Sequence, residues 1–340
     1  MVYVICFFIA LLLLLYITIY GKVLDYNIVL LMVTVAVSNG GYYALAVSHN
    51  LREAILATKV SYVLGAFSPT IIFFIICNIC KVEIPRVLIT IMYAVQLFIF
   101  MTVCTIGESE IYYKTAQYHI SKAGAYLTKT YGPMHTVYVV TLVFYTAAGI
   151  IAGMYSLQRK TVVSRINVDI LIFVDLFMVG VYLIEHLVHI DFELIPVAST
   201  AACGVILIPL IKTSVYSAYS NPEIFDSEFN KNGYIIFNKN LKYMGCGDRA
   251  KSIFPELTEW EMEKKIPGNG GRFNTFLRPA LMEFVKADSS VKNVVRTFEY
   301  KGKLYSYEIG RLLRSKKYLR GYYIMIIDVT EVIREAKGPA

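Results

Sequence analysis

Acidic, imidazole and phenol side chains recur in this sequence close to the ends of long apolar segments. Glu185, His186 and His189 lie within five residues of one another, and on a helix Glu185 and His189 would share one face because they are four residues apart. Such groups form hydrogen bonds and can exchange protons with a bound molecule. Further side chains of these kinds are Tyr42, Tyr62, Glu108, Glu110, His135 and Tyr138. One hypothesis is that these groups line an outward-facing ligand pocket. The alternative is that they are separately solvated at a membrane surface, where tyrosine is enriched.

Metal binding and catalysis are two further interpretations of this cluster. Carboxylate and imidazole groups both bind zinc, but one helix presents only two well-aligned ligands, from Glu185 and His189. No nucleophile and base stand at a convincing spacing for covalent catalysis. We therefore expect no metal site and no catalytic residues.

A second group of polar residues falls inside the apolar segments. Asp175 lies near the middle of one of them, where a charge costs about 2.5–3.5 kcal/mol on insertion scales. We expect this acid to be neutral or hydrogen-bonded, with Asn39, Gln96 and Ser68 as candidate partners. A proton relay is the alternative interpretation of Asp175.

Charged residues divide the chain into two regions. They make up 17% of the sequence, against about 25% in a typical soluble protein. The first 220 residues carry 22 of them, and the last 120 carry 36. Such a change in composition marks a domain boundary.

The apolar region contains seven stretches long enough for a helix to cross a bilayer, which takes about 20 residues. They are 2–20, 27–48, 57–80, 84–105, 134–157, 166–188 and 194–215. Short loops connect them, except for residues 106–133, which form a long polar segment rich in Tyr and Lys. The lipid bilayer is therefore one expected partner.

Loop charge predicts the orientation, because cytoplasmic loops carry an excess of Lys and Arg. With the N-terminus outside, seven basic residues fall on the inner side and five on the outer side. We expect a multi-pass protein of the inner (plasma) membrane with its N-terminus outside and its charged tail in the cytoplasm. The net charge of +8 agrees with this bias, and no nucleic-acid partner is expected.

The charged tail alternates between strand and helix patterns. Strands are expected at 234–237, 241–244, 293–300, 303–313 and 318–328, and helices at 249–254 and 276–286. Lys301-Gly302 is a hairpin signal between two of these strands. Two strands, helices and three antiparallel strands are the order of a PAS-type domain, in which helices pack on one face of the sheet. The expected fold class is a membrane all-α seven-helix bundle followed by an α+β PAS-like domain.

Several short stretches of the bundle carry a family resemblance when they are taken in order. They are Tyr43-Ala44-Leu45, 57–62, Gly65, Pro69, Arg86 and Tyr131-Gly132-Pro133. Together they resemble the N-terminal seven-transmembrane sensor region of bacterial histidine kinases and diguanylate cyclases, over residues 5–225. In the tail, Asp328-Val329-Thr330-Glu331 resembles the motif that ends many PAS domains, in which Asp328 and Thr330 would join the last strand to a signalling helix.

The resemblance implies a receptor of a two-component system or a related pathway. The expected domains are a sensor at 1–213, a linker at 214–230, a PAS-like domain at 231–330 and the start of a signalling helix at 331–340. No histidine follows His189 and no cyclase motif occurs, so a kinase or cyclase output would lie in a longer parent chain or a partner protein. The implied receptor is a homodimer that senses an extracellular or membrane-soluble small ligand.

Two alternatives to this interpretation stay open. A small-solute transporter or channel with a regulatory domain would also have many apolar helices, although the internal repeat common in transporters is not evident. A PAS-like domain can bind a cofactor, but it has no histidine for haem, and Cys246 stands in Gly-Cys-Gly-Asp and not in a flavin-reactive motif. We expect no cofactor.

Overall fold

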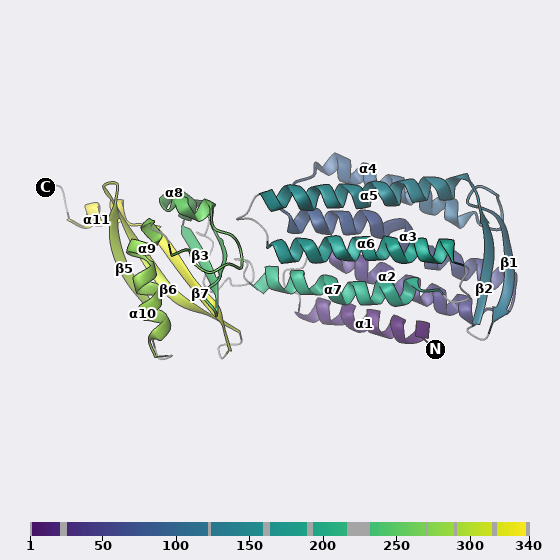
Figure 1. The fold of residues 1–340 in the computed structure, drawn as a ribbon, viewed down its shortest axis with the longest axis horizontal. Coiled ribbons are helices and arrows are strands. Elements are labelled where there is room, and N and C mark those ends of the chain that lie inside the picture. The colour runs from purple at the N-terminus through teal and green to yellow at the C-terminus, as the bar shows by residue number, and fades with distance from the viewer. Residues whose placement is uncertain are drawn as a thin grey trace. The chain divides into compact units, whose positions relative to one another are not determined.

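The computed structural model describes residues 2–20, 26–121, 124–158, 164–188, 193–215, 232–268, 271–288, 291–314 and 318–337. The chain forms two compact units. The first contains Met1–Leu157 and Ile166–Thr213, and the second contains Gln158–Arg165 and Ser214–Ala340. Figure 1 draws the helices of the first unit and the sheet of the second.

The first unit is a bundle of long helices. They are α1 (Val2–Tyr20), α2 (Tyr26–Ala46), α3 (Leu51–Ile79), α4 (Arg86–Cys104), α5 (Pro133–Gln158), α6 (Arg165–Leu187) and α7 (Ile195–Val215). Six of them are long and apolar enough to cross a membrane, and α7 contributes a shorter apolar stretch, Ile195–Pro209. The seven predicted segments are confirmed, and most helix ends agree within a few residues. The largest difference is that α3 begins earlier than expected.

The early start of α3 has a local cause in its first turn. The side chain of Asn50 accepts a hydrogen bond from the backbone N–H of Glu53 at 3.0 Å, and the Glu53 carboxylate accepts one from the backbone N–H of His49 at 2.9 Å. These reciprocal bonds satisfy N–H groups that have no partner inside the helix. They allow α3 to begin at Leu51, in a polar stretch ahead of the apolar one.

Helices α2 and α3 approach each other closely because small residues face each other. A Cβ atom on Gly41 would lie 2.5 Å from the backbone nitrogen of Ser61, so only glycine fits at this crossing. The Ser38 hydroxyl donates a hydrogen bond to the carbonyl oxygen of Ser61 at 2.7 Å. Small residues and hydroxyl groups of this kind are common where helices pack within membranes.

The long polar segment between α4 and α5 forms a β-hairpin, although its sequence predicted no strands. Strand β1 (Tyr113–Ser121) pairs antiparallel with β2 (Gly124–Tyr131). The hairpin lies across one end of the bundle (Figure 1), and the Tyr118 hydroxyl donates to the carbonyl oxygen of Ser48 beyond α2 at 2.6 Å. Gly132 joins β2 to α5, and a Cβ atom there would lie 2.4 Å from the carbonyl oxygens of Glu110 and Ile111. The hairpin is therefore a packed part of the first unit.

The second unit is a five-stranded antiparallel sheet with helices. Its strands are β3 (Gly233–Asn238), β4 (Tyr243–Cys246), β5 (Asn293–Tyr300), β6 (Lys303–Arg314) and β7 (Tyr318–Asp328). The spatial order is β4-β3-β7-β6-β5, which places the first and last strands side by side. Lys301 and Gly302 both have positive φ, 50° and 70°, as a two-residue hairpin turn requires. The predicted strands and the Lys301-Gly302 hairpin are present.

Short helices pack on this sheet. They are α8 (Asp248–Ile253), the 3₁₀ helix η3 (Pro255–Thr258), α9 (Arg272–Phe276) and α10 (Arg278–Lys286), and α11 (Thr330–Lys337) follows the last strand. The predicted helix at 276–286 is thus two helices, and it starts earlier than expected.

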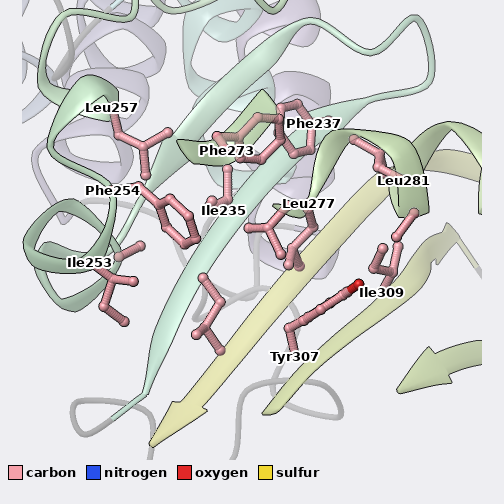
Figure 2. Packing of buried hydrophobic residues seen from close by; sticks show 14 of the residues in the cluster. Ile235, Phe237, Ile253, Phe254, Leu257, Phe273, Leu277, Leu281, Tyr307 and Ile309 are labelled. Atoms are coloured by element: carbon pink, nitrogen blue, oxygen red, sulfur yellow. The ribbon is translucent and has the colours of Figure 1, made fainter. Parts of the chain in front are cut away.

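The core of the second unit lies between these helices and the sheet. Figure 2 shows Phe254, Phe273 and Leu277 from the helical segments facing Ile235 and Phe237 of β3. All five side chains are fully buried. The burial of such apolar groups is the main favourable contribution to folding.

Candidate functional site: a cavity beneath the hairpin

A cavity of about 400 Å³ lies within the first unit, between the helices and the hairpin. Its walls come from α2, α3, α5 and α6, from strand β2 and from the first residues of α7. Small-molecule sites are typically concave, mostly apolar and supplied with a few polar groups. The cavity has this character, because apolar residues of the helices line it together with several polar residues from the helices and the hairpin.

The end of the cavity near the hairpin is lined by charged groups. Lys129 of β2 lies 3.7 Å from the Glu193 carboxylate, and the side chains of both are only about one-fifth exposed. The Glu185 carboxylate of α6 accepts hydrogen bonds from the backbone N–H groups of Leu194 and Ile195. The backbone N–H of Glu193 donates to the Tyr3 hydroxyl at 3.0 Å. Side chains from α1, α6 and β2 therefore hold the start of α7 in place.

Neighbouring acidic groups keep the Lys129 ammonium group protonated at this end of the cavity. Burial lowers the pKa of its ammonium group, but the nearby Glu193 carboxylate, together with Tyr131, Tyr42 and Glu185, raises the pKa above its ordinary value. Burial also raises the pKa of the neighbouring Tyr131 phenol, and Lys129 opposes that shift. The cavity thus carries one buried cation that is already matched by a carboxylate.

Aromatic rings form the middle of the cavity. Tyr62, Tyr138 and Tyr182 line it, with ring centroids 6.5 Å apart for Tyr62 and Tyr138 and 5.8 Å apart for Tyr138 and Tyr182. The Tyr62 hydroxyl accepts a hydrogen bond from Tyr113 at 2.6 Å, and the Tyr182 hydroxyl lies 3.2 Å from Nε2 of His135. Contacts between aromatic rings at these separations are favourable beyond their buried area, so the tyrosine rings are held in defined positions.

Asp175 lies at the deep end of the cavity. Its side chain is buried, and the Thr146 hydroxyl donates to Oδ1 at a long 3.5 Å. This partner was not predicted: Asn39 instead donates to the Thr200 hydroxyl at 3.0 Å. Gln96 is buried on α4, and neither polar atom of its side chain has a hydrogen-bond partner in the part of the chain that is described. Of the predicted partners, Ser68 lines the same cavity.

The predicted pocket residues divide into three sets in the structure, and a fourth comprises His189 alone. Five of them line the cavity: Tyr42, Tyr62, Tyr138, Glu185 and His186. His135 is buried behind the lining, where its ring stacks on Tyr131 at 3.7 Å. Glu108 and Glu110 lie elsewhere: both are exposed, and Glu108 forms a surface ion pair of 3.7 Å with Lys59. His189 lies outside the described residues.

Several lining residues were absent from the predicted set, chiefly Lys129, Tyr131, Tyr182 and Glu193. The abundance of Tyr and Lys in residues 106–133 was noted, but no strand was predicted there. A lining position on β2 depends on the pairing of the hairpin and on where it lies against the bundle. Within the described ranges, no group of three His, Cys, Asp or Glu residues could hold a metal ion.

The predicted relay residues lie in the second unit at the end of β7. Asp328 Oδ1 accepts hydrogen bonds from the Thr330 hydroxyl at 2.6 Å and from its backbone N–H at 3.2 Å. The Thr330 hydroxyl oxygen also accepts from the backbone N–H of Leu304 in β6 at 2.9 Å. Asp328 Oδ2 lies 3.1 Å from Lys303 and 3.6 Å from Arg249 of α8. The motif therefore joins the start of α11 to strand β6 and helix α8.

Comparison with known proteins places the first unit in a family. The family model for the N-terminal 7TM region of histidine kinases matches residues 2–217. The chain belongs to this family. The matched residues include every helix of the bundle and the hairpin, so the whole cavity belongs to the 7TM region. No curated protein matches the chain.

The match confirms the resemblance found in the sequence, and it supports the role of a membrane sensor input domain in a multi-pass membrane protein. The 7TM region ends close to the start of the segment predicted as a linker. The family model does not extend to the sheet of the second unit.

Proposed function

We propose that this chain is the input part of a bacterial signal-transduction protein in the plasma membrane. The cavity of the 7TM region binds a small extracellular or membrane-soluble ligand. The second unit acts as a PAS-like relay to a histidine-kinase or diguanylate cyclase output. The observation that carries the proposal is the cavity of about 400 Å³, lined by polar and aromatic groups, within a region of this family.

The contacts at the start of α7 support a route for the signal. Glu185 and Glu193 both line the cavity, and both take part in the interactions that hold the first residues of α7. Helix α7 is also the element that precedes the proposed linker, 214–230. A ligand that binds one position of α7 better than another shifts the population toward that position.

The order of elements in the second unit supports the PAS-like relay. It has two strands, then helices, then three antiparallel strands, and aromatic side chains fill its core, including Phe237, Trp260 and Phe273. The hydrogen bonds of Asp328 and Thr330 join the sheet directly to α11. We propose that α11 begins the signalling helix, and that the receptor works as a homodimer.

The proposed orientation places the hairpin and the polar end of the cavity outside the cell. If the N-terminus is outside, then the end of α2, the start of α3 and the end of α6 also lie outside. Tyr42 and Glu185 lie near these ends and line the cavity, and Tyr62 lines it from farther along α3. The second unit then lies in the cytoplasm, where an output domain can receive the signal.

A cavity-filling substitution tests this proposal. The full chain is placed in frame ahead of a histidine-kinase output in membrane vesicles, and autophosphorylation is measured with and without an extract of the culture medium. Val179→Trp fills the cavity lining and should abolish the response. The control is Leu176→Trp on the same helix, where the side chain is 49% exposed, and it should respond like the parent.

Equal responses of the parent and both variants would contradict the proposal. Solute flux through the vesicles, blocked by Val179→Trp and without any change in phosphorylation, would instead favour a transporter. Expression level and elution volume on gel filtration show whether each variant is folded.

A further inference from the structure

Asp175 stands out among the polar groups of the cavity because its hydrogen bonding is incomplete. The residue is 5% exposed, and it lines the cavity. The bond from Thr146 at 3.5 Å is the one hydrogen bond that Asp175 makes among the described residues. A buried carboxylate without good partners is costly, so this position calls for a further partner or for a bound proton.

The other acids of the cavity have positive partners, whereas Asp175 has none among the described lining residues. Glu193 pairs with Lys129 at 3.7 Å. Glu185 accepts from backbone N–H groups at the start of α7, where the helix dipole is positive. Lys129 is the one Lys or Arg in the lining, and it is already matched. A ligand that carries its own positive charge would complete the cavity.

Along α6, the lining residues that follow Asp175 within two turns are apolar and aromatic. Met178, Val179 and Tyr182 follow it on α6, at spacings of three, four and seven residues that keep them on nearly the same face. All three line the cavity, together with Leu64 of α3 and Leu142 of α5. Aromatic faces attract cations, most strongly where water is excluded. The rings of Tyr62, Tyr138 and Tyr182 therefore suit a positively charged ligand as well as its apolar part.

The length of the cavity limits the size of such a ligand. Asp175 and Glu185 both line it and are ten residues apart on α6, which corresponds to about 15 Å along a helix axis. A ring system with a short side chain is of this scale.

We propose that the cavity binds an organic amine, with its ammonium group at Asp175 and an apolar, preferably aromatic, body between the tyrosine rings. This inference rests on the proposed function, because it names the ligand class of the same cavity. The ammonium group donates to the Asp175 carboxylate, and the body displaces water from the apolar walls. A protonated Asp175 without a charged ligand is the competing explanation.

Three compounds with the same indole ring test the ligand class. Tryptamine is a cation, tryptophol is its neutral alcohol counterpart and indole-3-propionate is an anion. Binding to the full chain in lipid nanodiscs is measured at neutral pH by thermal stabilisation and by titration up to millimolar concentration. Tryptamine should bind, and the other two should bind at least about tenfold more weakly, because a charge-assisted bond is lost.

Substitutions test whether the amine binds at Asp175. Asp175→Asn should weaken tryptamine binding by about tenfold or more, and Asp169→Asn, an acid on the same helix outside the cavity lining, should leave it unchanged. Val179→Trp should also block binding while Asp175 remains, which keeps the test decisive if Asp175→Asn does not fold.

Three results would overturn the proposal: no binding of tryptamine, equal binding of the alcohol, or full binding by Asp175→Asn. If tryptamine does not bind while Val179→Trp still abolishes the kinase response, the proposed ligand class is wrong but the proposed function stands. If Val179→Trp leaves that response intact, the proposed function fails as well.

Discussion

The Glu185 carboxylate accepts a hydrogen bond from the backbone N–H of Ile195 at 2.8 Å. A side chain of α6 thereby caps the first turn of α7. The first N–H groups of any helix lack partners inside the helix, and an acceptor there also interacts favourably with the helix dipole. The start of α7 thus depends on a residue that lines the cavity.

Removal of this cap should loosen the start of α7. Glu185→Ala is expected to cost about 1 kcal/mol, as the loss of a capping side chain does, and amide hydrogen exchange at the first turn of α7 should become about fivefold faster. Glu185→Gln keeps an acceptor oxygen, so its effect should be smaller. Glu108→Gln, at an exposed ion pair, is the control and should change nothing at α7. Unchanged exchange in Glu185→Ala would show that the cap is not what holds this turn.

The ion pair of Lys129 and Glu193 should couple the hairpin to α7. In a double-mutant cycle with Lys129→Met and Glu193→Gln, we expect a coupling of about 1–2 kcal/mol in the free energy of unfolding, since the pair is mostly buried. Because the pKa of Lys129 is raised in the folded protein, the contribution is complete below its ordinary value of about 10.4. It is lost only as the pH rises through the higher folded pKa. Additive effects, or a coupling that disappears between pH 6 and pH 9, would contradict this assignment.

Gly132 should not tolerate a side chain. Gly132→Ala places a methyl group 2.4 Å from two backbone oxygens, which the chain cannot relieve by rotating a side chain. We expect destabilisation of more than about 2 kcal/mol and faster proteolysis of the hairpin. Gly180→Ala on α6 is the matched control, because a Cβ atom there meets nothing within 4 Å. Similar stability of the two variants would mean that the hairpin does not pack in this way.

The Asp328 and Thr330 motif should make the second unit sensitive to acid. The hydrogen bond from the Thr330 hydroxyl is the main cause that holds the pKa of Asp328 below its ordinary value; burial opposes it with a smaller effect, and Lys303 lowers the pKa further. The resulting stabilisation is complete above the unfolded-state pKa of about 3.9. It is lost as the pH falls through the lower folded pKa. Trp260 is the single tryptophan and lies buried in this unit, so its fluorescence reports unfolding of the unit in the full chain.

Thr330→Ala should therefore lower the unfolding midpoint near neutral pH and reduce its dependence on pH below 4. Thr330→Ser keeps the hydroxyl group and serves as the control. Identical acid profiles for the two variants would assign the pH dependence to other groups.

The membrane helices were predictable because long apolar stretches determine them almost alone. The early start of α3 depends on the hydrogen bonds of Asn50 and Glu53, which a hydropathy pattern does not contain. The hairpin was missed because its strands mix Thr, Tyr, Lys and Gln without a strong alternation. Its register is visible only once Tyr113 is paired with Tyr131.

The candidate site was partly predictable, because the same apolar stretches place some of its residues. Tyr42, Tyr62 and Glu185 could be placed near one end of the bundle, because helix ends are set by the length of the apolar stretches. The pairing of Lys129 with Glu193 joins residues 64 positions apart, and it depends on how the hairpin lies over the bundle. The contact between Asp175 and Thr146 was not predictable either, because it depends on the rotation of α6 against α5.

The two ends of the cavity belong to different kinds of structure. Its deep end is made by helices that must stay compatible with lipid, whereas β2 contributes one wall at the other end from a segment free of that constraint. Exposed positions of the hairpin can therefore vary during evolution, or be redesigned, without disturbing the apolar helices. If the cavity binds a ligand as proposed, its selectivity can be changed through the β2 wall while the helices keep their sequence.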